Sequence, residues 1–399
     1  MTHGQQGICA VIGAGSESLH AIKLAQRRGL RVVGLDSDPK AEGLTAVDDP
    51  VVVDIRDAEV VMEALRERSV SFLLPVPIGR WVLTAGTVND GMGMKGVGAQ
   101  AVERCVDKYL FHRVMASKGL RDGECFLVDE GTCLPSPAVY PIIMKPRFGS
   151  GSRSVFVAES AEQMASFASN LDFDEDYVFE TAAPGTEYGL DAAVVCDALH
   201  IILLREKINT APPARQCVGY FAVPHQEKTL YRRVEGFMEA AVAALGLRDC
   251  LLHADLMVCD DEVFPIEISP RPSGHMLSSV FTPAATGVLP VEQYLNYQMG
   301  QSFSFDPEGI NLLLIRYFDF GECEVIAVPG EEQIASFGGA VVDYRCSIKP
   351  GDRLCKVVDG HSVMGRGYVI IQGPTKQQMM SIAEELFALF ERKPLWTKE

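Results

Sequence analysis

Short apolar runs alternate with helical patterns over the first hundred residues. The runs ICAVIG, RVVGLD, VVVDI and SFLLPVP are separated by helical patterns at about 16–28 and 58–68. Strands that alternate with helices in this way predict βαβ units and a parallel sheet. Two further helical patterns follow between 98 and 119, and the second ends at a Gly C-cap signal. We therefore predict a Rossmann-like α/β domain in this part of the chain.

The middle of the chain changes to short strands. From about 124 to 195 they are separated by Gly/Pro turns and one helix near 161–169, which predicts a small α+β lobe inserted in a larger unit. That unit continues with a helix near 230–245 and the strands LLHADLMVCD and EVFPIEISP, joined by an acidic stretch, 259–262, that is typical of a hairpin turn. The last hundred residues mix strands with a helix at about 376–390. The prediction is a multi-domain α/β and α+β protein.

Composition narrows the classes of partner. At 399 residues the chain fits two or three domains, and a formal charge of −17 disfavours nucleic acid, which usually requires a basic face. Apolar runs stay below the roughly 18 residues of a membrane-spanning helix, and the first residues carry no signal-peptide pattern, so we expect a cytoplasmic protein with no membrane partner. Eleven scattered cysteines without a Cys-x-x-Cys pair indicate reduced thiols.

The segment VIGAGSES follows the first predicted strand. It places Gly13 and Gly15 in a turn, with Asp36 at the end of the second strand, as in a dinucleotide-binding unit. Ser18 stands where the third glycine is usual. The segment can therefore be interpreted in two ways, as an NAD-binding turn or as a Rossmann-like turn that binds no nucleotide.

A lysine followed by a glycine-rich loop ends the predicted strand 141–145. The strand delivers Lys145, and a turn before the strand 154–158 is formed by Gly149, Ser150, Gly151 and Ser152. Small residues let backbone N–H groups approach an anion, and the ammonium adds charge, which suits a triphosphate. The loop is not of the Walker type, because no Gly-Lys-Ser/Thr opens a helix. A flexible hairpin with a solvated lysine is the alternative.

Two carboxylates are predicted on one face of the strand pair. Asp255 and Glu267 can face each other within ~5 Å, where they repel unless a divalent cation lies between them. Hard oxygen ligands, with phosphate oxygens completing the shell, indicate magnesium. The acids at 260–262 compete for this role, but a turn position favours solvation. Arg271 follows and can neutralise charge on a transferring phosphoryl group or an acyl phosphate.

Other polar and aromatic residues carry weaker signals. His253 and His275 are expected to be core or rim side chains rather than metal ligands. Several residues lie on segments that could face a substrate pocket, or could equally be surface charges and core aromatics: Arg205, Lys207, Arg215, Tyr220 and Phe221.

In this order the motifs resemble the ATP-grasp superfamily, and the resemblance covers nearly the whole chain. It implies a Rossmann-like preATP-grasp domain at 1–106 and an ATP-grasp nucleotide-binding and catalytic domain at 107–300. A mobile lid lobe is expected at about 124–184, and a small C-terminal α+β subdomain at 301–399 completes the ATP-grasp unit.

The resemblance also implies a nucleotide site. DKYLFHRVMASKGL resembles the helix whose lysine contacts phosphate, here Lys108, and IIMKPRFGSGSRSV resembles the second lysine strand with its lid, which assigns Lys145 to phosphate and to catalysis. FETAAPGTEYGLD resembles the hinge that holds adenine, and Glu187 matches the acid that holds the ribose hydroxyls. The hinge residues are Glu180, Thr181, Ala182 and Ala183.

ADLMV…PIEISPRPSG resembles the metal-and-arginine signature, usually Glu-x-Asn-x-Arg. Asp255 and Glu267 then match magnesium ligands, with Mn²⁺ as the alternative ion, and Arg271 matches the catalytic arginine. Ser269 stands where Asn is usual, so a second metal position stays open.

Three further segments look most similar to the carboxylate–amine ligases typified by L-amino acid ligases: PRPSG, the following TPAATGVLPVEQYL, and the C-terminal KPGDRLCKVVDGHSVMGRGYVIIQGPTKQQM. This resemblance implies an ATP-dependent ligase that forms an amide or peptide bond through an acyl phosphate and releases ADP and phosphate. Its partners would be small-molecule carboxylates and amines, expected to be amino acids, with a homodimer left open. The alternatives are a purine-pathway or carboxylase-like ATP-grasp enzyme that uses a small carboxylate or bicarbonate, an NAD(P)-dependent oxidoreductase, and a non-catalytic nucleotide-binding regulator.

Overall fold

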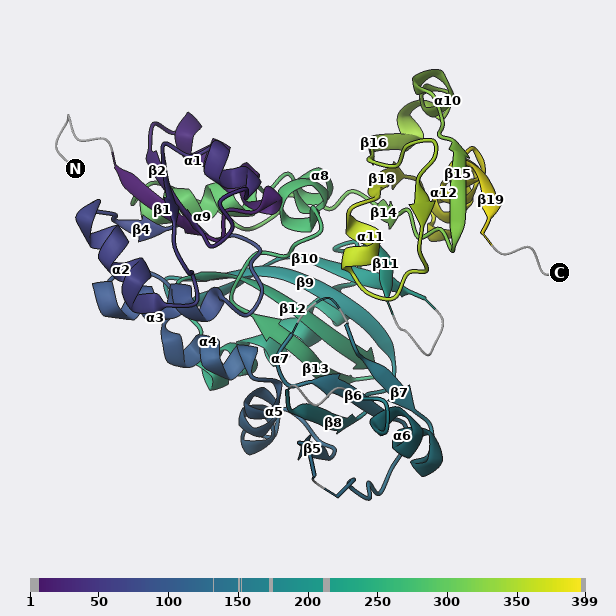
Figure 1. Cartoon of the computed structure of the whole chain (residues 1–399), viewed down its shortest axis with the longest axis horizontal. Coiled ribbons are helices and arrows are strands. Elements are labelled where there is room, and N and C mark those ends of the chain that lie inside the picture. The colour runs from purple at the N-terminus through teal and green to yellow at the C-terminus, as the bar shows by residue number, and fades with distance from the viewer. Residues whose placement is uncertain are drawn as a thin grey trace. The chain divides into compact units, whose positions relative to one another are not determined.

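A computed structural model describes residues 7–131, 133–149, 151, 153–171, 175–210 and 216–395 (Figure 1). The chain divides into two compact units with interleaved segments. The first unit takes in Met1–Asp122, Gly189–Leu204 and Lys228–Glu308. The second takes in Gly123–Tyr188, Arg205–Glu227 and Gly309–Glu399.

The first unit contains the parallel sheet that the alternating pattern predicts. Its strands are β1 (Ile8–Ile12), β2 (Arg31–Asp36), β3 (Asp49–Val52) and β4 (Phe72–Leu73). They lie in the order β3-β2-β1-β4, and β1 pairs in parallel with both β2 and β4. The helical elements around them are η1 (Ser16–Ser18), α1 (Leu19–Arg27), η2 (Glu42–Thr45), α2 (Ala58–Glu67) and α3 (Val82–Met92). The α/β prediction for this segment is confirmed.

Two helices of the first unit begin at aspartate caps. Asp57 accepts hydrogen bonds from backbone N–H groups of the first turn of α2, and Asp107 does the same for α5 (Lys108–Ser117), which follows α4 (Ala99–Val106). A carboxylate at the cap satisfies N–H groups that have no partner inside the helix. The cap at Asp107 therefore fixes Lys108 as the first residue of α5.

Further elements of the first unit are α7 (Lys228–Leu245), β12 (Cys250–Cys259), β13 (Glu262–Ser269), η3 (Leu277–Phe281), α8 (Thr282–Thr286) and α9 (Pro290–Gln298). The hairpin predicted at 259–262 is confirmed: β12 and β13 are antiparallel, and Asp260 adopts a left-handed φ of 50° in the turn. The turn acids are exposed, and Arg233 pairs with the carboxylate of Asp261.

The second unit contains the predicted α+β lobe. Its antiparallel sheet has the order β5-β8-β6-β7. The elements are β5 (Cys125–Val128), β6 (Ile142–Pro146), β7 (Phe156–Ala158), α6 (Ala161–Ala168) and β8 (Tyr177–Thr181). Apolar side chains of these strands pack with Met164 and Ala168 of α6, so the lobe has a core of its own.

Another sheet has the order β13-β12-β9-β10-β11-β14-β18-β16. Its further strands are β9 (Thr186–Val195), β10 (Ala198–Asn209), β11 (Cys217–Ala222), β14 (Leu313–Tyr317), β16 (Val341–Cys346) and β18 (Gly367–Gln372). The C-terminal segment adds β15 (Cys323–Ala327), α10 (Glu331–Ala335), η4 (Gly338–Ala340), β17 (Arg353–Leu354), α11 (His361–Met364), α12 (Lys376–Ala388) and β19 (Glu391–Pro394). Within the described residues, no helix combines the length and the apolar character needed to cross a membrane.

Candidate active site

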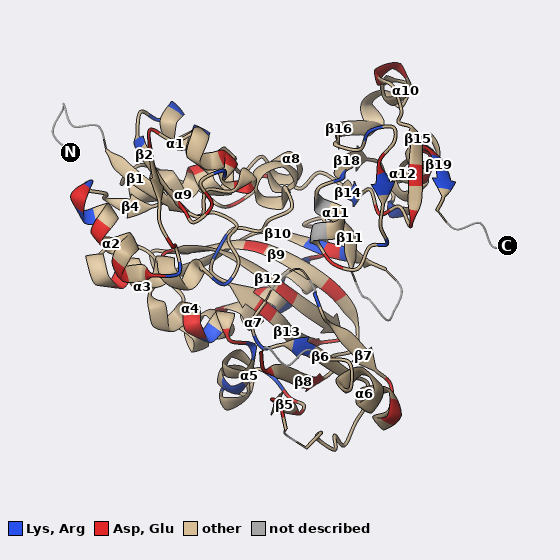
Figure 2. Cartoon of the chain, in the orientation of Figure 1, with Lys and Arg blue, Asp and Glu red and all other residues tan. Residues whose placement is uncertain are grey.

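The hairpin β12–β13 brings the predicted metal ligands together. Asp255 lies directly opposite Glu267, and His253 lies opposite Ser269. Facing residues share one side of an antiparallel pair, as do residues two apart along a strand, so all of these side chains line one face. Acidic positions on both strands are visible in Figure 2.

These acids form an incomplete site for a cation. Two carboxylates directly opposite each other repel, and a divalent cation between them removes the repulsion. Nowhere in the described part of the chain are three or more His, Cys, Asp or Glu side chains grouped so as to hold a metal. Two carboxylates completed by phosphate oxygens are, however, a ligand set that Mg²⁺ accepts. The donors present fit a magnesium ion that arrives with a nucleotide.

The sequence did not predict how closely His253 lies to the first acid. Its Nε2 is 3.7 Å from Oδ1 of Asp255, and the two side chains are only 13% and 18% exposed. This separation is too long for a hydrogen bond, but it allows an ion pair when the ring is protonated. The alternating pattern LLHADL places both residues on one face, so the signal was present.

Arg271 follows β13 in a loop held by backbone contacts. Its N–H donates to Ser269 O at 2.9 Å, and its Nη1 donates to Pro272 O at 3.0 Å. Farther along this loop, Met276 adopts a left-handed φ of 61° and donates its N–H to Oε1 of Glu17 at 3.2 Å. Residues other than glycine rarely adopt such a φ, and those that do are often found at functional sites. Glu17 thus holds the loop after Arg271, a role that nothing in the sequence indicated.

In the second unit, Lys145 and Glu180 form a buried ion pair between β6 and β8. Lys145 Nζ lies 2.9 Å from Glu180 Oε1, and each side chain is 6% exposed. Pairing compensates the loss of hydration that both charges suffer on burial. Glu180, a residue of the predicted hinge, therefore fixes the position of the Lys145 ammonium, which is predicted to bind phosphate.

The glycine-rich loop after Lys145 uses the freedom of its glycines. Gly149 has φ 137° and Gly151 has φ 73°, conformations that residues with a Cβ rarely adopt. The carbonyl of Gly151 accepts a hydrogen bond from the N–H of Gly360 at 2.9 Å. Ser150 and Ser152, predicted to contact phosphate, lie outside the described residues.

Two backbone N–H groups in the middle of the predicted hinge already have acceptors. Thr181 donates to Glu124 O at 3.0 Å and Ala182 donates to Pro141 O at 2.9 Å. Among the residues that the structure describes, the N–H of Ala183 has no hydrogen-bond acceptor. Of these three groups, the N–H of Ala183 is the one available to a base.

Glu187, the predicted ribose ligand, has charged and polar partners. Its Oε1 lies 2.7 Å from Nζ of Lys207, and its Oε2 accepts a hydrogen bond from Nδ2 of Asn209 at 2.7 Å. Both charged side chains are largely buried: 14% of the Glu187 side chain and 8% of the Lys207 side chain is exposed. Burial raises the pKa of the neighbouring Cys217 thiol, and the charge of Lys207 opposes the rise. Asn209 was not predicted as part of the site.

The residues suggested for a substrate pocket lie mainly in the interior. Arg205 is fully buried, with its guanidinium carbon 5.5 Å from the ring centre of Tyr220. Tyr220 and Phe221 are 5% and 6% exposed, as core aromatics would be. Arg215 lies outside the described residues.

The turn at Gly13 is closed by the chain itself. The Asp36 carboxylate accepts the N–H of Ala14 at 2.8 Å, and Gly43 donates its N–H to Ala14 O at 2.8 Å. A Cβ at Gly13 would lie 2.6 Å from Ile78 Cγ2. The glycine thus allows a close approach of Ile78, where a dinucleotide-binding turn would admit a pyrophosphate. This geometry disfavours NAD binding.

Sequence comparison identifies a known domain. Residues 105–275 match the model of the ATP-grasp domain family. A formate-dependent phosphoribosylglycinamide formyltransferase from Salmonella schwarzengrund is 22% identical over 320 residues, which span 76% of this chain and 79% of that protein. The arginine-specific large chain of carbamoyl phosphate synthase from Geobacillus stearothermophilus is 20% identical over 276 residues, which span 66% of this chain but only 26% of the synthase chain.

Structure comparison extends the likeness over nearly the whole chain. The crystal structure of L-amino acid ligase from Bacillus licheniformis superposes with a TM-score of 0.80, covering 98% of this chain and 100% of the ligase, at 16% identity. At this identity the likeness concerns the fold. Residues 105–275 therefore contain an ATP-grasp domain, and the fold of nearly the whole chain is similar to that of the ligase.

Proposed function

We propose that this protein is an ATP-dependent carboxylate–amine ligase that forms an amide or peptide bond and releases ADP and phosphate. The observation that carries the proposal is the register of β12 and β13, which sets Asp255 opposite Glu267 inside the matched ATP-grasp domain. Arg271 follows on the same segment. Phosphoryl transfer depends mainly on positioning and charge neutralisation, and these residue types supply both.

The residues of the second unit are assigned to the nucleotide. Lys145, held by Glu180, binds phosphate oxygens, and the Ala183 N–H receives the base. Glu187 binds the ribose hydroxyls, for which it exchanges its bonds to Lys207 and Asn209. Gly149 and Gly151, which follow Lys145, let backbone N–H groups approach the phosphates.

The residues of the first unit are assigned to the reacting groups. Asp255 and Glu267 hold magnesium, or Mn²⁺ in its place, and the ion supplies charge neutralisation at the phosphates when bound. Ser269 is a weaker donor beside them, and Lys108 contacts phosphate from the start of α5. Arg271 stabilises negative charge on the acyl phosphate.

The reaction proceeds in two transfers. A substrate carboxylate oxygen attacks the γ-phosphorus of ATP, and the bond between this phosphorus and the oxygen that bridges it to the β-phosphate breaks. The products of this transfer are an acyl phosphate and ADP. An amine then attacks the acyl carbon, loses a proton, and displaces inorganic phosphate. Exclusion of water protects the acyl phosphate from hydrolysis between these transfers.

The finer assignment is to acid–amino acid ligases, with small-molecule carboxylates and amines, expected to be amino acids, as partners. It is supported by the high fold similarity to L-amino acid ligase. The similarity to the formate-dependent formyltransferase supports a second candidate function, that of an enzyme of purine synthesis that uses a small carboxylate. The two candidates differ in the acid that supports ADP release.

Glu267→Gln tests the proposal. Wild-type protein is incubated with Mg-ATP, pooled carboxylic and amino acids, and hydroxylamine, which traps acyl phosphates as hydroxamates. We expect wild type to form ADP and hydroxamate and Glu267→Gln to lose both, because one of two metal carboxylates is gone. The matched control is Glu262→Gln, at the exposed start of the same strand, which should retain wild-type rates.

The outcomes separate the candidate functions. A hydroxamate of formate alone favours the formyltransferase-like enzyme, whereas amino-acid hydroxamates favour the ligase. ATP binding without any ADP release indicates a non-catalytic regulator. Normal turnover in Glu267→Gln, with a circular dichroism spectrum like that of wild type, refutes the metal assignment.

A further inference from the structure

The loop that follows Arg271 contains two consecutive residues in the left-handed backbone conformation. His275 has φ 60° and Met276 has φ 61°. Because both residues carry a Cβ, this conformation is costly, and it persists only where surrounding contacts hold it. The turn at 274–276 therefore depends on contacts from other parts of the first unit.

Glu17 supplies such contacts from a distant part of the sequence. Its Oε1 accepts a hydrogen bond from the N–H of Met276 at 3.2 Å. Its Oε2 lies close to Gly274, where an added Cβ would come within 2.7 Å of this oxygen. Both oxygens of the carboxylate thus lie against the strained turn, and the missing side chain at Gly274 permits this approach.

The glycine turn after β1 holds Glu17 in place. Glu17 lies in η1, and the next residue, Ser18, donates its hydroxyl to Gly13 O at 2.6 Å. The Asp36 carboxylate fixes the turn from β2, because it accepts the N–H of Ala14 at 2.8 Å. The turn that resembles a dinucleotide site therefore presents a carboxylate to the loop after β13.

Hydrogen bonds on the other side connect Met276 to the start of the loop. The carbonyl of Met276 accepts the N–H groups of Val280 and Phe281, both at 3.0 Å, at the beginning of η3. From the same element, the buried Ser278 hydroxyl donates to Ser273 O at 2.6 Å. A movement of Met276 would therefore be passed on to Ser273, which lies two residues after the arginine.

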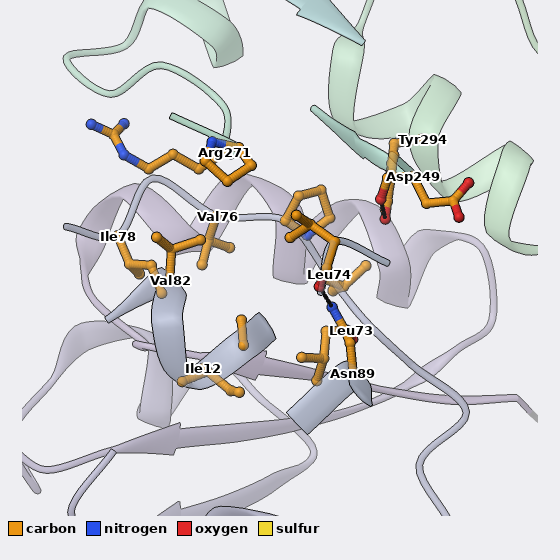
Figure 3. A pocket seen from close by; sticks show the side chains of 14 residues that line it. Ile12, Leu73, Leu74, Val76, Ile78, Val82, Asn89, Asp249, Arg271 and Tyr294 are labelled. Atoms are coloured by element: carbon orange, nitrogen blue, oxygen red, sulfur yellow. Dashed lines mark hydrogen bonds between the residues drawn. The ribbon is translucent and has the colours of Figure 1, made fainter. Parts of the chain in front are cut away.

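The position of Arg271 depends on the backbone of this loop. Its N–H donates to Ser269 O at 2.9 Å, and its Nη1 donates to Pro272 O at 3.0 Å. In Figure 3 the guanidinium lies on the side of Ile78 and Val82. Since one of its nitrogen atoms is bonded to the loop itself, a shift of the loop backbone would carry the guanidinium with it.

We propose that Glu17 is a positioning residue for Arg271. Its carboxylate holds the strained turn at 274–276, and the turn in its correct place fixes the guanidinium where negative charge develops during phosphoryl transfer. The inference rests on the proposed ligase function, and it adds a residue of the glycine turn to the groups on which catalysis depends.

Glu17→Ala tests the proposal in the assays of ADP release and hydroxamate formation. We expect kcat to fall ~10- to 100-fold, because misplacement of a catalytic group by about 1 Å can cost this much, with KM for ATP and for the acid unchanged. Glu17→Gln keeps an oxygen that accepts the N–H of Met276 and should retain most of the wild-type kcat. The matched control is Glu42→Ala, which removes an exposed acid of the same unit and should keep wild-type rates.

Gly274→Ala is a second way to break the contact, because the new Cβ would displace the Glu17 carboxylate. It should lower kcat in the same way, and it decides the question if Glu17→Ala fails to fold. If both variants fold and keep the wild-type kcat, the proposal is overturned. A raised KM with an unchanged kcat would identify Glu17 as a substrate contact and would overturn it as well.

Two double variants test whether Glu17 acts through the arginine. Adding Glu17→Ala to Arg271→Lys should cause little further loss, because effects that pass through one group do not add. Adding Met276→Gly to Glu17→Ala should recover part of kcat, since glycine adopts a φ of this sign without strain. Additive losses in the first case, or no recovery in the second, would overturn the proposal.

Amide hydrogen exchange separates this proposal from the ligase function. It is measured without ATP on peptides that contain Met276, and unfolding temperatures identify variants that remain folded. Exchange at Met276 should be faster in Glu17→Ala than in wild type and close to wild type in Glu17→Gln. If a folded Glu17→Ala exchanges like wild type, the positioning role fails whatever the activity. If exchange changes as expected but wild type releases no ADP with any acid, the ligase function fails, and the catalytic role of Glu17 fails with it.

Discussion

Removing Lys145 should destabilise the small lobe strongly. Its Nζ lies 2.9 Å from Glu180 Oε1, with 6% of each side chain exposed. At an effective dielectric constant of about 20, the Coulomb attraction over this distance is about 6 kcal/mol. Loss of one partner of a buried pair typically costs about 3–5 kcal/mol, because the other charge stays buried. We therefore expect Lys145→Met to lower the free energy of unfolding of the lobe by about 3–5 kcal/mol.

Amide hydrogen exchange of β6 and β8, without nucleotide, measures this change. Arg147→Met is the control, since Arg147 pairs with Asp176 in the same lobe at 2.8 Å but with 26% and 36% exposure. A partly exposed pair should contribute at most about 1 kcal/mol. Adding Glu180→Gln to Lys145→Met should recover much of the loss. The reasoning is refuted if Lys145→Met exchanges like wild type, or if the double variant is no more stable than the single one.

Two other predictions concern the first unit. Gly43→Ala should lower the free energy of unfolding by about 1–3 kcal/mol, because its Cβ would lie 2.6 Å from Ala14 O. Gly15→Ala, which meets nothing within 4 Å, should stay within about 0.5 kcal/mol of wild type. Equal urea midpoints for the two variants would contradict this. Burial raises the pKa of the Cys9 thiol from 9.0 to about 12. At pH 8 Cys9 should therefore resist iodoacetamide while the exposed Cys133 reacts, as peptide mass spectrometry can show. Because the folded pKa is the higher one, the linked stability is complete below pH 9 and is lost as the pH rises toward 12, so the urea midpoint should fall across that window. Fast labelling of native Cys9 at pH 8 would overturn the assignment.

Much of the candidate site was predictable because local rules place it. Alternation along LLHADL and PIEIS sets Asp255 and Glu267 on fixed faces, and the short acidic turn between the strands sets their register. The cap at Asp107 similarly places Lys108 at the start of a helix. Such features depend on periodicity and turn chemistry within some twenty residues, which a sequence displays directly.

The contacts between distant segments were decided by the tertiary structure. Glu187 is bound by Lys207 and Asn209 of another strand, and Glu17 holds the loop at Met276, although no motif links these positions.

The sequence by itself determined the order of strands and helices, the ATP-grasp motifs and the facing carboxylates. It left the glycine turn at Gly13 open between a dinucleotide site and a structural turn. The tertiary structure decided for the structural turn, by packing Ile78 against the glycine. The physical reason is that hydrogen-bond periodicity is local, whereas side-chain packing depends on residues that meet only after the chain has folded.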